Sequence, residues 1–116
     1  MNKLFNQNIK AILFDMDGVV IDSEKLYYQS EKKLLSQYDV VFDDSDWLNI
    51  RGCTEKQFYN LVYSKSNINI PRNILISQGR KIIKKILTKK LQYMNGFSEI
   101  HSIFKQKYKL ALVTST

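Results

Sequence analysis

Two aspartates near the N-terminus have the types and spacing of a carboxylate pair that acts on phosphate. Asp15 and Asp17 follow an apolar run at residues 9–14 (IKAILF), and Gly18, which lets the chain turn sharply, comes directly after them. Side chains two positions apart in an extended segment point to the same side. A carboxylate can attack phosphorus, and a neighbouring one can give a proton to the leaving oxygen and later take one from water. The pair therefore predicts phosphoryl transfer.

A cation is expected at this pair, because two carboxylates repel each other and the phosphate. Mg²⁺ prefers oxygen ligands and is the natural choice. A calcium loop that began at Asp15 would need Gly and Glu at its sixth and twelfth positions, which are Val20 and Leu26. The sequence also lacks a Gly-rich phosphate loop and a dinucleotide fingerprint. We therefore expect Mg²⁺ at Asp15 and Asp17.

The elements that must position this pair are predicted to form an α/β fold. Apolar runs at 9–14 and 109–114 are expected to be buried strands. A right-handed crossover can make them parallel neighbours, and such sheets bind ligands beyond the carboxyl ends of their strands. Five helices are expected between the strands. The first covers about 23–38, and a short second helix starts at Asp44 or Ser45 and buries Trp47, Leu48 and Ile50. The third follows a capping box at Thr54–Gln57, the fourth runs from Pro71 to about Leu91, and the fifth covers 97–107.

The charge is uneven along the chain, which has a formal net charge of +7. Nine of the eleven acids lie in residues 15–46, and residues 80–109 hold nine bases against one acid. We interpret the basic segment as a solvated helix face; the alternative is a surface that attracts a phosphorylated substrate. No nucleic-acid-binding motif is present, and we do not expect nucleic acid as a partner.

The sequence gives no sign of export or of a membrane partner. No apolar run approaches the roughly 18 residues of a membrane span, and residues 1–10 do not read as a signal peptide. Cys53 is the single cysteine, so the chain cannot form an internal disulfide. We therefore expect a cytoplasmic protein.

The segment AILFDMDGVVIDSE resembles the first motif of the haloacid dehalogenase superfamily, in the branch with a helical cap that includes β-phosphoglucomutase and phosphoglycolate-type phosphatases. LALVTST near the C-terminus resembles the second motif. The resemblance implies a Rossmann-like core of parallel strands with an inserted α-helical cap. The expected division is the first core strand and catalytic loop at 1–22, the cap at 23–91, and the return to the core at 92–116.

The same resemblance implies roles for individual residues. Asp15 would attack phosphorus and form an aspartyl-phosphate. Asp17 would be the general acid and base, and its backbone carbonyl would also bind Mg²⁺. Thr114 and Ser115 would bind phosphoryl oxygens. The resemblance also implies that the substrate is a small phosphorylated metabolite.

Residues of the expected cap bear on specificity. Arg51, Gly52, Cys53 and Thr54 resemble the substrate-specificity loop of this branch, and the alternative interpretation is a helix stop followed by an N-cap. The mutases favour His where this chain has Tyr27, and a basic residue where it has Glu55. We therefore expect a phosphatase, with a β-phosphoglucomutase-like mutase as the alternative.

The family also uses a lysine and an acidic pair that would come after the second motif. We expect this sequence to be an N-terminal portion that lacks the rest of the core and is inactive alone. A shortened reading frame or a fragment explains this most simply. A second polypeptide that carries the missing core is one alternative, and a non-catalytic remnant of such an enzyme is another.

Overall fold

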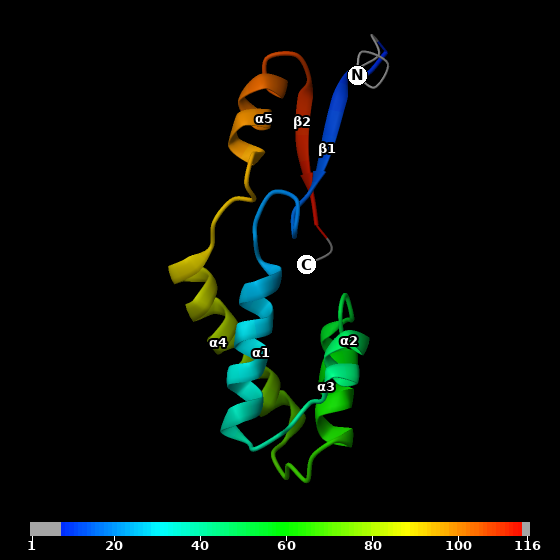
Figure 1. The fold of residues 1–116 in the computed structure, drawn as a ribbon, viewed down its shortest axis with the longest axis vertical. Coiled ribbons are helices and arrows are strands. Elements are labelled where there is room, and N and C mark those ends of the chain that lie inside the picture. Colours follow the sequence, from blue (N-terminus) through cyan, green and yellow to red (C-terminus); the bar gives the residue numbers. More distant parts are fainter. Residues whose placement is uncertain (1–7, 115–116) are drawn as a thin grey trace. The chain divides into compact units, whose positions relative to one another are not determined.

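The structure, a computed structural model, describes residues 8–114 and has the expected α/β architecture. Contacts divide these residues into two compact units. The sheet unit comprises residues 8–25 and 90–114, and the helical unit comprises Leu26–Lys89. The elements in chain order are β1 (Ala11–Asp15), α1 (Glu24–Gln37), α2 (Asp44–Asn49), α3 (Glu55–Ser64), α4 (Arg72–Lys90), α5 (Phe97–Phe104) and β2 (Lys109–Val113) (Figure 1).

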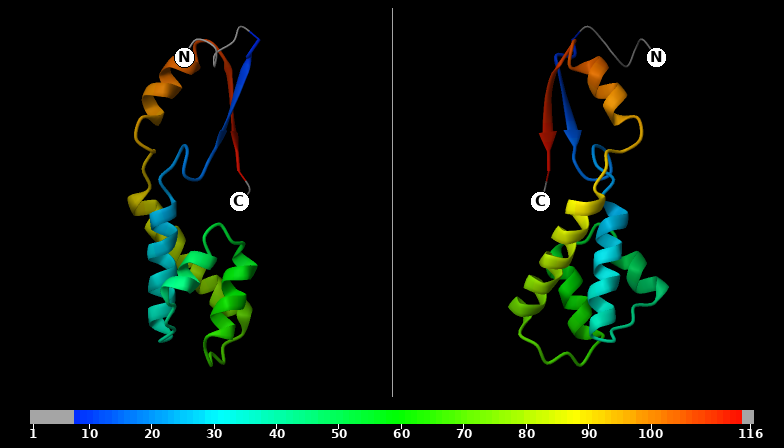
Figure 2. Two further views of the ribbon diagram at one scale, coloured as in Figure 1. Left: turned by 45° about the vertical axis from the view of Figure 1, so that its right-hand side comes forward. Right: turned by 90° about the vertical axis from the view of Figure 1, so that its left-hand side faces the viewer.

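The sheet unit contains the predicted parallel pair of strands. β1 and β2 are hydrogen-bonded in a register that runs from Ala11 opposite Lys109 to Asp15 opposite Val113. α5 lies beside one face of this pair (Figure 2), where the rings of Phe14 and Phe97 meet edge to face at 5.4 Å. The right-hand view of Figure 2 shows the two strands side by side.

The expectation that both strands are buried was wrong. Side chains alternate between the faces of a strand, so Leu13 and Asp15 point away from the face that carries Phe14. Leu13 is 68% exposed and Val113, opposite Asp15, is 51% exposed. A single helix covers one face of a two-stranded sheet and leaves the other face uncovered within the described residues.

The helical unit has a continuous apolar core. Its fully buried side chains include Leu34 on α1, Val62 on α3 and Leu75 on α4, with exposed fractions of 2%, 1% and 0%. The predicted capping box opens α3: Gln57 N–H donates to Thr54 Oγ1 at 3.2 Å, and Thr54 N–H donates to Gln57 Oε1 at 2.9 Å. The complete cluster consists of Leu34, Leu35, Val40, Phe42, Phe58, Tyr59, Val62 and Leu75.

α2 begins at Asp44 as predicted, but its inward face differs from the prediction. Asp43 and Asp46 form a second capping box, with bonds of 2.8 and 3.0 Å between the backbone N–H of each and the carboxylate of the other. Asp46 is only 6% exposed and pairs with Lys65 at 3.1 Å. Residues 46 and 50 share one helix face, so Leu48 faces outward. It is 66% exposed, and its predicted burial was wrong.

α4 packs closely against α3 because residue 79 has no side chain. A Cβ built on Gly79 would overlap the hydroxyl oxygen of Tyr59 and would lie 3.2 Å from Leu34 Cδ2. α4 starts directly after Pro71, whose carbonyl accepts from Leu75 N–H at 3.2 Å. No helix within residues 8–114 combines the length and apolar character needed to cross a membrane.

Candidate functional site

The loop after β1 closes on itself immediately beyond the two aspartates. The carbonyl of Met16 accepts from the N–H groups of Val20 and Ile21 at 3.0 and 3.1 Å, and Gly18 N–H donates to the carbonyl of Ile21 at 2.9 Å. Gly18 has φ of +78°, a left-handed conformation that favours glycine. The chain therefore reverses within a few residues and keeps Asp17 beside the end of the strand.

The parallel pairing brings two predicted site residues to one edge of the sheet. Asp15 is the last residue of β1 and pairs with Val113, the last residue of β2. Met16 N–H donates to the carbonyl of Val113 at 3.0 Å. Thr114 follows Val113 directly, so Asp15 and Thr114 both lie at the carboxyl edge of the strand pair. Ser115, the other predicted phosphate-binding residue, lies outside the described residues.

Ser23 contacts a predicted site residue, and the sequence did not predict this contact. Its side chain is 1% exposed, and its Oγ donates a hydrogen bond to Asp17 Oδ1 at 2.7 Å. The available signal was the serine that follows Asp22 just before the helix. Its contact with Asp17 depends on the closure of the loop, and the spacing of Asp17 and Ser23 in the sequence does not predict that closure.

The chemistry of the donor atoms agrees with Mg²⁺. Asp15 offers carboxylate oxygens and Asp17 its backbone carbonyl oxygen, and both are the hard ligands that this ion prefers. Residues 8–114 hold no group of three or more His, Cys, Asp or Glu side chains that could bind a metal. The described residues therefore fit Mg²⁺ in ligand type and would supply only part of its coordination sphere.

The predicted specificity loop lies between α2 and α3 in the helical unit. Arg51, Gly52 and Cys53 line a hollow of about 390 Å³ together with side chains of α2 and α3. Thr54 caps α3 through its hydroxyl. The alternative interpretation of this segment, a helix stop followed by an N-cap, therefore applies to Thr54. Gly52 has φ of +68°, which suits the turn between the two helices. A role of this loop in binding substrate stays a prediction.

A half-buried carboxyl group lies in the same unit. Burial raises the pKa of Glu31 on α1 to about 7. The pKa of the Cys53 thiol is raised by its own burial and, to a smaller extent, by the charge of Glu31. Burial also raises the pKa of Tyr59 to about 12, with Glu55 and Glu31 among the contributing charges. The helical unit thus contains a carboxyl group that titrates near neutral pH.

Glu55, one of the two positions that distinguish the chain from the mutases, is committed to an ion pair. Arg80 of α4 donates to both its carboxylate oxygens at 2.6 and 3.0 Å. These hydrogen bonds lower the pKa of Glu55 and raise that of Arg80. The Glu55 side chain therefore links α3 to α4.

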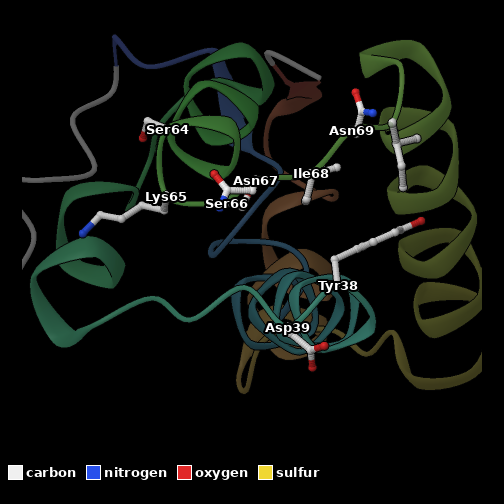
Figure 3. Close-up of a pocket in the computed structure, with 9 residues that line it drawn as sticks. Tyr38, Asp39, Ser64, Lys65, Ser66, Asn67, Ile68 and Asn69 are labelled. Atoms are coloured by element: carbon white, nitrogen blue, oxygen red, sulfur yellow. The ribbon is translucent and has the colours of Figure 1, made fainter.

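A larger hollow, of about 550 Å³, lies in the helical unit where α1 and α3 end (Figure 3). Several of its polar side chains already have partners: Ser64 and Ser66 donate to the carbonyls of Leu61 and Val62, and Lys65 pairs with Asp46. None of the predicted site residues lines it. The lining residues are Tyr38, Asp39, Ser64, Lys65, Ser66, Asn67, Ile68, Asn69 and Ile70.

Comparison with known proteins places this arrangement in a family. The family model of haloacid dehalogenase-like hydrolases matches residues 12–116. A phosphorylated carbohydrates phosphatase of Thermotoga maritima is 27% identical over 109 residues, which are 93% of this chain and 50% of that protein. The mitochondrial (DL)-glycerol-3-phosphatase 1 of Arabidopsis thaliana is 42% identical over 62 residues, 53% of this chain and 21% of that protein.

Solved structures agree with the fold. A Thermotoga maritima protein provisionally assigned as a beta-phosphoglucomutase matches with a TM-score of 0.76 at 25% identity, over 93% of this chain and 50% of that one. A haloacid dehalogenase-type hydrolase from Entamoeba histolytica matches with a TM-score of 0.75 at 18% identity, again over 93% of this chain and 50% of that one. The chain spans about half the length of the first of these curated relatives. The predicted family is confirmed: this chain belongs to the haloacid dehalogenase-like hydrolases.

Proposed function

We propose that this protein is a Mg²⁺-dependent phosphatase that acts on small phosphorylated metabolites through an aspartyl-phosphate. The observation that carries the proposal is the position of Asp15. It ends a parallel strand, at the sheet edge where Thr114 also lies, with Asp17 on the closed loop beside it. This placement supports the proposal, in which Asp15 would be the nucleophile, Asp17 the proton donor and Thr114 a hydroxyl ligand for phosphate.

In the proposed reaction, a carboxylate oxygen of Asp15 attacks phosphorus and the bond from phosphorus to the leaving oxygen breaks. Asp17 gives its proton to that leaving oxygen. Asp17 then takes a proton from a water molecule, whose oxygen attacks phosphorus and displaces Asp15. The products are the dephosphorylated alcohol and inorganic phosphate, and both aspartates return to their initial states. Thr114 and Ser115 would bind phosphoryl oxygens during both steps.

Mg²⁺, bound by Asp15 and Asp17, would neutralise the charge that gathers on the phosphoryl oxygens. The first curated relative is about twice as long as this chain, and the described residues supply only part of a metal site. We therefore expect turnover to need the other half of the fold, in the same polypeptide or in a second one.

The names of the relatives support the proposed substrate class. One is a phosphatase of phosphorylated carbohydrates and another a phosphatase of glycerol 3-phosphate. The structural similarity to a provisionally assigned beta-phosphoglucomutase supports a sugar-phosphate mutase as the second candidate. In that reaction a sugar hydroxyl, in place of water, takes the phosphoryl group from Asp15. Because Glu55 is held by Arg80, and because Tyr27 stands in place of the mutases' histidine, the phosphatase is favoured.

The test is hydrolysis of p-nitrophenyl phosphate and of sugar phosphates by the protein purified from its own cells, with and without Mg²⁺. We expect Mg²⁺-dependent release of inorganic phosphate, and its loss in Asp15→Asn. Asp22→Asn is the matched control, since Asp22 lies in the same loop but pairs with Lys25 at 2.9 Å. Activity that survives Asp15→Asn would contradict the proposal, and no hydrolysis at all would favour a non-catalytic remnant.

A further inference from the structure

The side chain of Ser23 has an unusual environment for a serine at the start of a helix. It directly precedes α1 yet is 1% exposed, which makes it one of the most buried side chains in the described chain. Its hydroxyl donates to Asp17 Oδ1 at 2.7 Å. A hydroxyl group has one hydrogen to donate, so this donor is used entirely on the Asp17 carboxylate.

The backbone around Ser23 is fixed independently of this contact. The segment that precedes it is hydrogen-bonded to the returning chain: Asp22 N–H donates to the carbonyl of Gln92, and Met94 N–H donates to the carbonyl of Val20, both at 2.9 Å. An isolated bridge between Ile21 and Tyr93 lies between these bonds. Ser23 is therefore held by main-chain contacts and can act as a fixed donor toward Asp17.

We propose that Ser23 is a positioning residue for Asp17. Its hydroxyl holds Oδ1 and selects one rotamer of the Asp17 side chain, so that Oδ2 is the oxygen that carries the proton to and from substrate. A hydroxyl that donates to a carboxylate makes a stronger hydrogen bond than one that donates to a neutral group. The kinetic consequence of this inference rests on the proposed phosphatase function, while its structural consequence does not.

The structural test uses the 116-residue chain and needs no turnover. NMR scalar couplings of the Asp17 Cβ protons report whether this side chain has one χ1 rotamer or several. We expect one rotamer in the wild type and in Ser23→Thr, which keeps a hydroxyl, and averaged rotamers in Ser23→Ala. Ser30→Ala is the matched control: Ser30 is also buried, at 6% exposed, but its hydroxyl donates to the carbonyl of Tyr27.

The kinetic test uses the protein purified from its own cells and compares two leaving groups. For an alkyl phosphate, whose leaving oxygen needs a proton, we expect Ser23→Ala to lower kcat/KM about tenfold or more, the scale of a hydrogen bond to a charged group. For p-nitrophenyl phosphate, whose leaving group departs readily as an anion, the loss should be much smaller. A substitution that only damaged the fold would lower both values equally.

Three results would overturn the proposal. The first is several Asp17 rotamers in the wild type, which would show that Ser23 does not hold the side chain even without any substitution. The second is a single unchanged rotamer in a folded Ser23→Ala chain. The third is an equal loss with both substrates. Loss of the proposed function itself would appear separately, as activity that survives Asp15→Asn, and would leave the rotamer measurement decisive.

Discussion

The helical unit and the sheet unit differ sharply in how much apolar surface they bury. Of the ten buried hydrophobic side chains described, nine lie in the helical unit, and Val20 is the one in the sheet unit. The sheet unit instead exposes Leu13, Ile103 and Leu112 by more than half. Burial of apolar surface is the main favourable term in folding. Hydrophobic stabilisation is therefore concentrated in the helical unit, whereas the aspartates that would do the chemistry lie in the other.

The largest predicted effect compares the same substitution in the two units. Leu75→Ala removes a side chain that is 0% exposed and should lower the free energy of unfolding by about 3 kcal/mol. Leu13→Ala, at a position 68% exposed, should lower it by about 0.5 kcal/mol or less. Urea denaturation of the 116-residue chain measures both. Equal losses would contradict the contrast between the units.

A second prediction concerns the close packing of α3 and α4. Gly79→Ala adds a methyl group where the Tyr59 hydroxyl lies, and we expect a loss of about 2 kcal/mol from overpacking, although alanine favours helices. Tyr59→Phe in the same chain removes that oxygen and leaves the ring carbon at an ordinary contact distance of 3.4 Å. The double variant should recover most of the loss. Without such recovery, the clash would not be with the hydroxyl.

The third and smallest predicted effect concerns Glu31. The folded chain keeps its proton up to about pH 7, whereas the unfolded chain releases it near 4.5. The folded state thus loses stability as the pH rises from 4.5 to 7. Glu31→Gln cannot ionise and should be more stable than the wild type at pH 8, by about 1 kcal/mol after allowance for partial exposure. At pH 4 the two should unfold alike. If the free energies of unfolding of the two proteins differed by the same amount at both pH values, the raised pKa of Glu31 would be contradicted.

The sequence predicted features that are encoded in short, specific segments of the chain. The capping box of Thr54 and Gln57 is encoded within four residues, and the start of α2 at Asp44 is equally local. The parallel pairing followed from two apolar runs and the handedness rule for crossovers. The Asp15 and Asp17 motif predicted the family, because its residue types and spacing are specific.

The features that the sequence did not predict depend on contacts that form only in the folded chain. Asp46 takes an inward position in place of Leu48 because Lys65, at the C-terminal end of α3, neutralises it. Leu75 of α4 is fully buried, in a core that also contains residues of α1 and α3. The contact of Ser23 with Asp17 requires a closed loop. The exposure of Leu13 depends on how many layers cover the sheet, which periodicity does not encode.

The most direct test of the central claim, that Asp15 is the nucleophile, is to trap the phosphorylated enzyme. The protein purified from its own cells is mixed with substrate and Mg²⁺, quenched in acid and analysed by peptide mass spectrometry. We predict one added phosphoryl group, sensitive to hydroxylamine as an acyl-phosphate is, on the peptide that contains Asp15. It should be present in Asp22→Asn and absent in Asp15→Asn. A phosphoryl group on another residue, or turnover without any phosphorylated enzyme, would contradict the account.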